Sequence, residues 1–405
     1  MRKLLSLGVC FCWCCCVSLG AIAAEPDATI ELLKQQIEQL QKQVVALEKA
    51  QQTFNEREEQ RRLTEQDKAA DMVTTAAVIS ETTSTSPTAN KPSEKVSKAP
   101  QNNVRVYATM RPTYGYFDEK GESFWDVRDA LSHAGIKASN EFMPGWTAVL
   151  HGEWGIDISN NGDFGKARRA YVAVESPVGR VGIGKQRPPQ YLLIAEYVDI
   201  FNHANSPFSY DAEGIFFVDN MVTYRLQTGG FNWLAAGQFD GDGGSDRADL
   251  VNLGVSYDIN GFHSAITYLQ QDSITANQVD GDDEVWAAVL ANDFGNGLYL
   301  AAAYQDKRYN RDLVPEQRTG HTLDISGAYR LSEQFRLKLG YFDFDDGHRA
   351  FLSQGYDGYN TTLEWLPDDN LRFHIEYLTR NYDYLDDFDS WSVGFRCDFA
   401  KDWQF

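Results

Sequence analysis

From residue 103 to Phe405, apolar and polar side chains alternate with the two-residue period of a β-strand. In the segment 251–259 every second residue is apolar: Val251, Leu253, Val255, Tyr257 and Ile259. Asn260-Gly261 then forms a two-residue hairpin turn of the type that requires positive φ. This part of the chain therefore folds as antiparallel sheet with one apolar face and one polar face, and its architecture depends on which face meets water.

Sixteen such segments follow one another, and we predict strands at 104–117, 130–140, 145–158, 166–176, 179–187, 219–228, 231–240, 249–258, 261–270, 284–293, 297–306, 321–331, 334–344, 356–366, 371–381 and 389–399. Seven connections are short, such as "SPVG", "TGG" and "PDDN". Eight are longer and often acidic, such as "QDSITANQVDGDD". The two kinds alternate strictly. Short turns at one end of a meander and long loops at the other are typical of an outer-membrane barrel.

Alternation alone is also compatible with a soluble sandwich. Four features favour a membrane barrel. Open sheets rarely exceed about ten strands, and strands of about ten residues suffice to cross a tilted path through a bilayer. Tyr257, Trp365, Tyr377 and Trp391 lie near strand ends, as in the aromatic girdles of such barrels, and the chain ends in Phe405. We therefore expect an all-β, sixteen-stranded antiparallel transmembrane barrel.

The barrel hypothesis assigns the two faces. The apolar series of segment 251–259 should contact lipid, whereas Asn252, Ser256 and Asp258 should face water. In the same way, Arg336, Lys338, Arg372 and Arg396 alternate with apolar residues in late strands. We expect these four to be ordinary hydrated residues of the lumen wall.

The N-terminal hundred residues have a different texture. Residues 1–24 combine a basic start, an apolar run and small residues before Glu25, which predicts a cleaved secretory signal too short to span a bilayer. Five of the six cysteines lie in it, so only Cys397 remains and no disulfide framework is expected.

Residues 25–70 carry a heptad pattern whose apolar positions are Ile30, Leu33, Ile37, Leu40, Val44 and Leu47. This spacing predicts a coiled coil, and the alternative is a helix packed on its own domain. Residues 71–102, rich in Thr, Ser, Ala, Pro and Lys, predict a flexible linker. The barrel domain then occupies residues 103–405.

The stretches "VRVYATMRPTYGYF", "SHAGIKASNEFMPGWTAVLHGEWGIDI" and "GKARRAYVAVESPVGRVGIGKQ" resemble the general porins of Gram-negative bacteria. Those proteins are trimeric, sixteen-stranded diffusion channels, and some carry an N-terminal coiled coil. The resemblance implies a homotrimer in the outer membrane that passes small hydrophilic solutes and ions. Residues 188–218 fall where the third loop of that family folds into the barrel and narrows it.

The resemblance also implies a charged constriction. Its basic wall falls on Arg111, His133, Lys137, Arg168 and Lys185, with Thr109 at a further wall position. Its acidic side falls on Asp199, Glu196, Asp211, Glu213 and the wall residue Glu153. His203 stands where the family has a second loop acid. The basic lumen residues and the missing second loop acid predict a mild preference for anions.

We expect further partners at the two ends of the barrel. The acidic long loops would meet lipopolysaccharide and outer-membrane lipid, and a periplasmic coiled coil could contact the cell wall. A dedicated calcium loop is disfavoured because "DGDGGSD" lacks the distal Glu. Nothing in the sequence indicates a cofactor, metal, nucleotide or nucleic-acid site.

Two other functions stay open at this point. A barrel lipase or protease would need a nucleophile and a base, and "FNHANSPF" places His203 near Ser206, while His348 lies beside acids. Neither has an orienting third group at a recognisable spacing, and there is no G-x-S-x-G motif. Alternatively, the barrel is mainly structural and the N-terminal segment tethers the envelope.

Overall fold

The computed structural model describes residues 102–159, 162, 164–202, 215–241, 248–275, 278–312, 314–349 and 352–405. The predicted signal peptide, the coiled coil and all but the last residue of the predicted linker lie outside these residues. Within the described ranges, no helix is both long and apolar enough to cross a bilayer.

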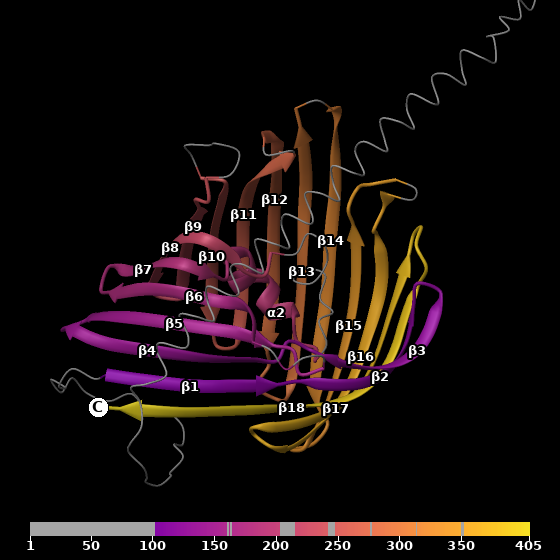
Figure 1. Ribbon diagram of the computed structural model, residues 1–405, viewed down its shortest axis with the longest axis horizontal. Helices are drawn as coiled ribbons and strands as arrows, with labels where there is room; N and C mark the ends of the chain where they lie inside the picture. The colour runs from indigo at the N-terminus through magenta and orange to yellow at the C-terminus, as the bar shows by residue number, and fades with distance from the viewer. Residues whose placement is uncertain are drawn as a thin grey trace, which may run out of the picture. The chain divides into compact units, whose positions relative to one another are not determined.

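The described residues form β-strands and two short helical turns (Figure 1). In chain order these are β1 (Asn102–Met110), β2 (Pro112–Glu119), β3 (Glu122–Asp129), β4 (His133–Met143), β5 (Trp146–Ile156), β6 (Phe164–Ser176), β7 (Gly179–Gln186), η1 (Tyr191–Ala195), α2 (Glu196–Val198), β8 (Val218–Thr228), β9 (Phe231–Gln238), β10 (Leu250–Ile259), β11 (Phe262–Thr275), β12 (Gln278–Asp293), β13 (Leu298–Arg311), β14 (Val314–Arg330), β15 (Phe335–Asp345), β16 (Tyr356–Asp368), β17 (Leu371–Tyr382) and β18 (Phe388–Gln404).

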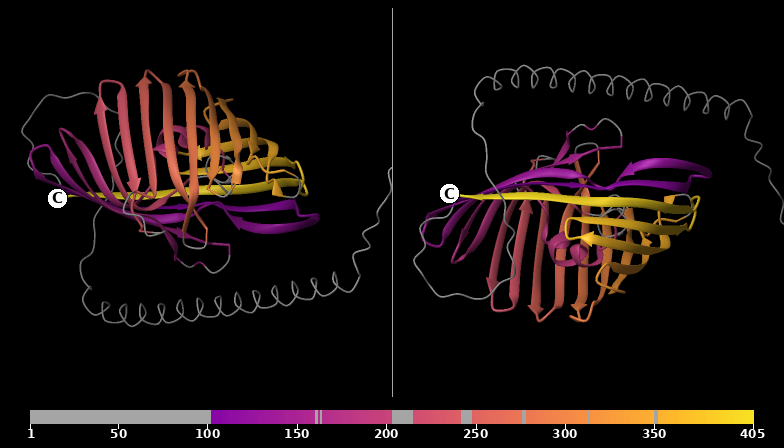
Figure 2. Two further views of the ribbon diagram at one scale, coloured as in Figure 1. Left: turned by 90° about the horizontal axis from the view of Figure 1, so that it is seen from above. Right: turned by 90° about the horizontal axis from the view of Figure 1, so that it is seen from below.

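The strands close into one antiparallel ring with sixteen positions. β1 and β2 both pair with β18 on one side, β1 pairs with β4 on the other, and all remaining neighbours in the ring are consecutive in sequence. β2 continues β1 beyond Arg111, and β3 leads into β4 across residues 130–132, so the first two strands of the ring are each split into two segments. Figure 2 shows the indigo first strands beside the yellow last strand from both sides. The predicted sixteen-stranded barrel is confirmed.

The ring closes along the whole of β18. Asn103 pairs with Gln404, and Asn102 and Phe405 exchange backbone hydrogen bonds at 3.2 and 3.1 Å. The prediction that the last strand stops at residue 399 was therefore too short. In hydrocarbon an unpaired backbone N–H or C=O costs several kcal/mol, roughly the price of a lost hydrogen bond, so the seam continues to the last residue.

The seven predicted short turns are present between the predicted strand pairs. Three predicted long loops are wrong, because residues 118–129, 271–283 and 307–320 largely continue the strands as tall hairpins (Figure 1). Their polar residues suggested loops, but in the structure they pair across strands, as Arg311 Nη1 does with Asp283 Oδ1 at 2.7 Å. A hairpin that extends past the apolar band has no need of an apolar face.

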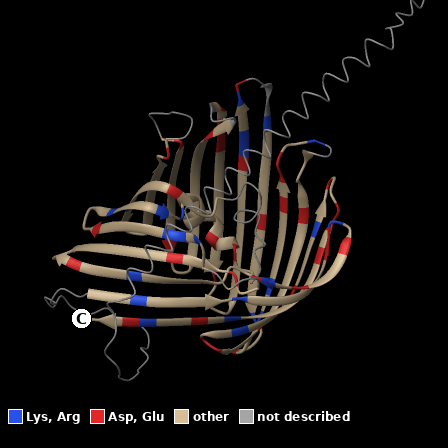
Figure 3. Ribbon diagram, in the orientation of Figure 1, with Lys and Arg blue, Asp and Glu red and all other residues tan. Residues whose placement is uncertain are grey.

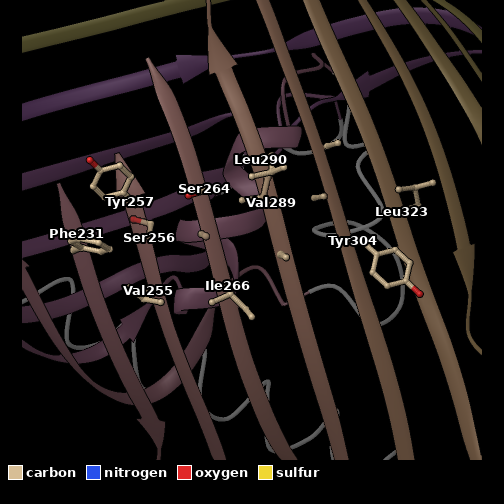
Figure 4. Close-up of a pocket in the computed structure, with 14 residues that line it drawn as sticks. Phe231, Val255, Ser256, Tyr257, Ser264, Ile266, Val289, Leu290, Tyr304 and Leu323 are labelled. Atoms are coloured by element: carbon tan, nitrogen blue, oxygen red, sulfur yellow. The ribbon is translucent and has the colours of Figure 1, made fainter. Parts of the chain in front are cut away.

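The outer face of the ring is apolar, as predicted. Leu253 and Ile266 are 46% and 48% exposed there. Figure 4 shows a shallow apolar hollow on this face across β9–β14, lined by outward side chains that include Val255, Tyr257 and Tyr304. Its lining continues the outward apolar series, so the hollow is part of the predicted lipid-facing wall.

The inner face differs from the prediction at its centre. Asn252 and Ser256 point inward, but they are 0% and 2% exposed rather than open to water. Asn252 Oδ1 accepts a hydrogen bond from the backbone N–H of Gln190 at 2.6 Å. The reason is that the segment between β7 and β8 enters the ring and covers this part of the wall.

We expect the turn at Gly261 to be sensitive to substitution. Its φ is +87°, and an added Cβ would lie 2.4 Å from the backbone oxygen of Asp293. Gly261→Ala should therefore lower the fraction of protein that refolds in detergent. This fraction is measured on a gel as the share of protein in the folded band, which disappears when the sample is heated. The conformational strain alone is about 1 kcal/mol.

Gly295 provides the matched control for this prediction. Its φ is +71°, and an added Cβ would meet nothing within 4 Å. Gly295→Ala should cost only the backbone strain, so a loss equal to that of Gly261→Ala would contradict the clash.

Candidate pore constriction

The segment between β7 and β8 places a short helical turn inside the ring of strands (Figure 1). Two prolines, Pro188 and Pro189, precede it, and η1 and α2 then run from Tyr191 to Val198. Its apolar residues Leu193, Ile194 and Val198 are buried. They pack on small inward residues of the wall, namely Ala265, Ala287, Ala291, Ala301 and Ala303. Alanine at these positions leaves the space that the inserted turn fills.

The start of the inserted segment is held by polar residues of β10–β13. Besides its backbone bond to Asn252, Gln190 donates from Nε2 to Oε1 of Gln305 at 2.9 Å. His263 Nε2 lies 2.9 Å from the backbone oxygen of Leu193, and the ring of His263 stacks on that of Tyr197 at 3.4 Å. These contacts satisfy the backbone groups that a helical turn this short leaves unpaired.

The end of the segment is held from the opposite part of the wall. Lys338 Nζ donates to the backbone oxygen of Ile200 at 2.5 Å, and Arg111 Nη2 donates to that of Asn202 at 2.5 Å. Asn202 in turn donates from Nδ2 to Oε1 of Glu364 at 2.9 Å. The inserted segment is thus anchored at both ends, and two of its anchors are cations.

A cavity of about 580 Å³ lies between the inserted segment and the wall. Among the residues that the structure describes, its charged lining is predominantly basic. Eight described cations line it: Arg111, Arg168, Arg169, Arg187, Arg336, Lys338, Arg372 and Arg396. Four described carboxylates line it: Glu153, Glu196, Asp199 and Asp293. Figure 3 shows basic and acidic positions on the strands around the inserted segment.

One basic group gathers around Glu153 on β5. Arg168 Nε lies 2.8 Å from Oε1 of Glu153, and Arg169 Nη1 lies 3.8 Å from its Oε2. Tyr107 Oη also donates to Oε2, at 2.6 Å. Glu153 is 3% exposed, so the carboxylate lies behind the arginines and holds them in place.

A β-bulge explains how two adjacent arginines reach the same group. Opposite β5, Glu153 pairs with Arg169 while Trp154 pairs with Ala167, which leaves Arg168 as the extra residue. Tyr171 and Ala173 on β6 point into the barrel. If the strand alternated strictly, Arg169 would point inward as they do and Arg168 would point outward. The bulge turns Arg168 inward as well.

A second basic group gathers around Glu364 on β16, which is 0% exposed. Arg336 and Lys338 approach its carboxylate to 2.6 and 2.7 Å, and Arg372 to 4.0 Å. Arg396 Nε lies 2.9 Å from Asp398 on the same strand, and Thr109 also donates to Asp398. Arg336, Lys338 and Arg372 lie in the first residues of β15 and β17, and Arg396 of β18 pairs with Arg372.

The inserted segment carries two of the acids. Asp199 ends α2 and accepts a hydrogen bond from Oη of Tyr191 at 3.0 Å. Burial, together with the charge of Asp199, raises the pKa of Tyr191 well above its ordinary value, so this phenol stays a donor. Glu196 lies 3.7 Å from Nη1 of Arg187.

The structure brings most, but not all, of the residues named from the sequence to this cavity. Six of them line it: Arg111, His133, Arg168, Glu153, Glu196 and Asp199. Lys137 and Lys185 do not. Lys137 lies two inward positions nearer the short turn than His133, and Lys185 pairs with Asp219 at 2.6 Å. Asp211, Glu213 and His203 lie outside the described residues.

Sequence reasoning missed other residues of the lining. Arg336, Lys338, Arg372 and Arg396, which we assigned to the ordinary wall, all line the cavity, as do Arg169, Arg187 and Asp293. The signal that could have found Arg336, Lys338 and Arg372 is their common inward parity and their closeness to the short turns that precede β15 and β17, and Arg396 joins them by pairing with Arg372. Arg169 could have been found from the parity of Tyr171.

Comparison with known proteins gives three kinds of result. The family described as Gram-negative porin matches residues 74–405. No curated protein matches the chain. Among solved structures, the anion-selective porin from Comamonas acidovorans is similar at a TM-score of 0.62 and 17% identity, covering 74% of this chain and 100% of that one.

Two further solved structures cover the same share of this chain. The trimer form of in-vitro folded OmpT of Vibrio cholerae has a TM-score of 0.57 and 15% identity and is covered to 99%. The outer membrane channel DcaP of Acinetobacter baumannii has a TM-score of 0.55 and 12% identity and is covered to 97%. At these identities the likeness concerns the fold alone.

We expect Glu364 to matter for stability. Glu364→Gln keeps an oxygen for Asn202 but removes the charge that faces Lys338 and Arg336, so the unfolding free energy should fall by about 2–4 kcal/mol. The midpoint of heat-induced unfolding, followed by gel mobility, measures this loss.

Glu175 is the control, because it is 51% exposed and its contact with Arg180 is 3.5 Å. Glu175→Gln should change stability by less than about 1 kcal/mol. Equal midpoints for the two variants would contradict a structural role for the buried carboxylate.

Proposed function

Because the chain belongs to the Gram-negative porin family and is an outer-membrane channel for passive diffusion rather than an enzyme, we propose that it passes small hydrophilic solutes with a preference for anions. The observation that carries the preference is the lining of the constriction cavity, where the described residues supply eight cations against four carboxylates. When the nearby carboxylates Glu364, Glu376 and Asp398 are added, the described residues still supply eight cations against seven carboxylates.

The placement of these charges supports the proposal. A narrow aqueous passage with low-dielectric walls focuses the field of fixed charges on passing ions. Glu153 and Glu364 are 3% and 0% exposed, so a passing ion meets the arginines in front of them first. An anion therefore gains favourable interactions along the inserted segment that a cation does not.

The assembly is also a proposal. One structural neighbour is described as a trimer form, and we propose a homotrimer for this chain. We further propose that residues 25–70 form a coiled coil in the periplasm, with core positions Ile30, Leu33, Ile37, Leu40, Val44 and Leu47. The oligomeric state of the barrel would then set the number of helices in this coiled coil. Lipopolysaccharide at the acidic loops and the cell wall at the coiled coil are the corresponding partners.

Reversal potentials in a potassium chloride gradient across a planar bilayer test the preference. The parent channel should be anion-selective. Arg168→Ala removes one cation from the cavity and should move the reversal potential toward zero, with the chloride-to-potassium permeability ratio falling roughly two- to fivefold.

Lys137→Ala is the matched control, since Lys137 is a basic wall residue that does not line the cavity. It should leave the permeability ratio near that of the parent. A strongly cation-selective parent would overturn the proposal.

Envelope tethering is the second candidate function, and deletion of residues 25–101, which keeps the seam residue Asn102, separates it from transport. If the N-terminal segment serves only assembly or anchoring, the deleted protein should conduct like the parent in bilayers. Unchanged conductance with a leakier cell envelope, measured by detergent sensitivity, would favour tethering. Lost conductance would instead tie the segment to channel formation.

A further inference from the structure

Three aromatic rings on the inserted segment lie against Arg187 and against Arg168 of the first basic group. The guanidinium carbon of Arg187 lies 3.9 Å from the ring centre of Tyr191, 4.9 Å from that of Phe216 and 5.4 Å from that of Phe217. Arg168 lies 5.4 and 5.0 Å from the two phenylalanine rings. Tyr191, Phe216 and Phe217, here called the aromatic platform, thus contact the arginines from one side.

The rings of the platform also support each other. Tyr191 and Phe216 meet edge to face at 4.8 Å, and Phe216 and Phe217 meet edge to face at 4.5 Å. Tyr191 is further fixed by its hydrogen bond to Asp199. Aromatic rings packed in this way have few rotamers, so they offer the arginines a rigid surface.

Arg187 is weakly neutralised compared with its neighbours. Arg168 donates to Glu153 at 2.8 Å, whereas the nearest carboxylate given for Arg187, that of Glu196, lies at 3.7 Å. The Nε of Arg187 is buried and has no hydrogen-bond partner among the described residues. Its side chain is 13% exposed and lines the cavity. Arg187 therefore has donor capacity that the described residues do not use.

A guanidinium that stacks on a ring keeps its N–H groups in its own plane. The ring face satisfies the face of the cation, and the edge remains available for a partner. That edge matches an anion with two coplanar oxygens, which accepts two parallel hydrogen bonds. A spherical halide is attracted by the positive charge but lacks the second coplanar oxygen that accepts the second hydrogen bond.

We propose that the aromatic platform positions Arg187 as an oxyanion-binding subsite of the constriction, which selects carboxylate-bearing solutes over halides. The proposal rests on the anion preference proposed above and names the class of solute. Arg187 touches the solute, and Phe216 and Phe217 are positioning residues. The cavity of about 580 Å³ leaves room for an acetate-sized ion, and binding at one fork stays weak enough for release.

Bi-ionic reversal potentials test the subsite, with potassium acetate on one side of a planar bilayer and potassium chloride on the other. Arg187→Lys keeps the charge but removes the fork, and Phe217→Leu keeps an apolar side chain but removes the ring. Each should lower the acetate-to-chloride permeability ratio roughly two- to fivefold. In the parent, the acetate current should saturate at lower concentration than in Arg187→Lys.

Two sets of controls separate positioning from folding. Phe216→Tyr and Phe217→Tyr keep the rings and should retain the parental ratio. Phe388→Leu removes a ring that lies 5.9 Å from Arg380, and neither residue lines the cavity. This variant should therefore also leave the ratio unchanged. All variants are compared as folded, heat-sensitive oligomers, and if Phe217→Leu does not fold, Arg187→Lys decides the test.

The outcomes distinguish this proposal from the one it rests on. A parental ratio in Arg187→Lys, or an effect of Phe388→Leu equal to that of Phe217→Leu, would overturn the subsite even in an anion-selective channel. A parent without anion preference in a potassium chloride gradient would overturn the proposed function instead, while the acetate-to-chloride ratio would still report on the subsite.

Discussion

Backbone pairing is the constraint on which this fold depends. A chain that crosses hydrocarbon as strands has no water to satisfy its N–H and C=O groups, so the sheet must have no edge. The seam between β1 and β18 meets this requirement as far as Asn102 and Phe405. Once the ring is closed, the apolar side chains can face outward, and the inward face is released from any need to form a core.

That freedom is used to place charge in a confined space. The inserted segment fills one side of the lumen and rests on alanines of β11–β13, while Gln190, His263 and Lys338 contribute its polar anchors. Buried carboxylates at 153 and 364 then hold arginines from several strands. Rigid cations in front and buried anions behind give the cavity its positive face.

The period-two pattern was sufficient to predict the strands, the short turns and the outward face, because lipid imposes the alternation at every position. It was insufficient where the alternation breaks. The bulge that turns Arg168 inward beside Arg169 has no signature in polarity. The hairpins at β11–β14 were taken for loops because strands above the apolar band are polar on both faces.

The second basic group was missed for a different reason. The alternation within each strand predicts that the following side chains point inward: Arg336, Lys338, Arg372 and Arg396. That they line one cavity depends on how the strands are shifted along one another, which the alternation does not give. Within this group, one side chain has both a structural and an electrostatic function. Lys338 both anchors Ile200 and carries pore charge, so substitutions there change the position of the inserted segment and the field together. Arg187 contacts the inserted segment through Glu196 at 3.7 Å and the ring of Tyr191, but it makes none of the anchoring hydrogen bonds described above, so its charge can be altered while those anchors remain.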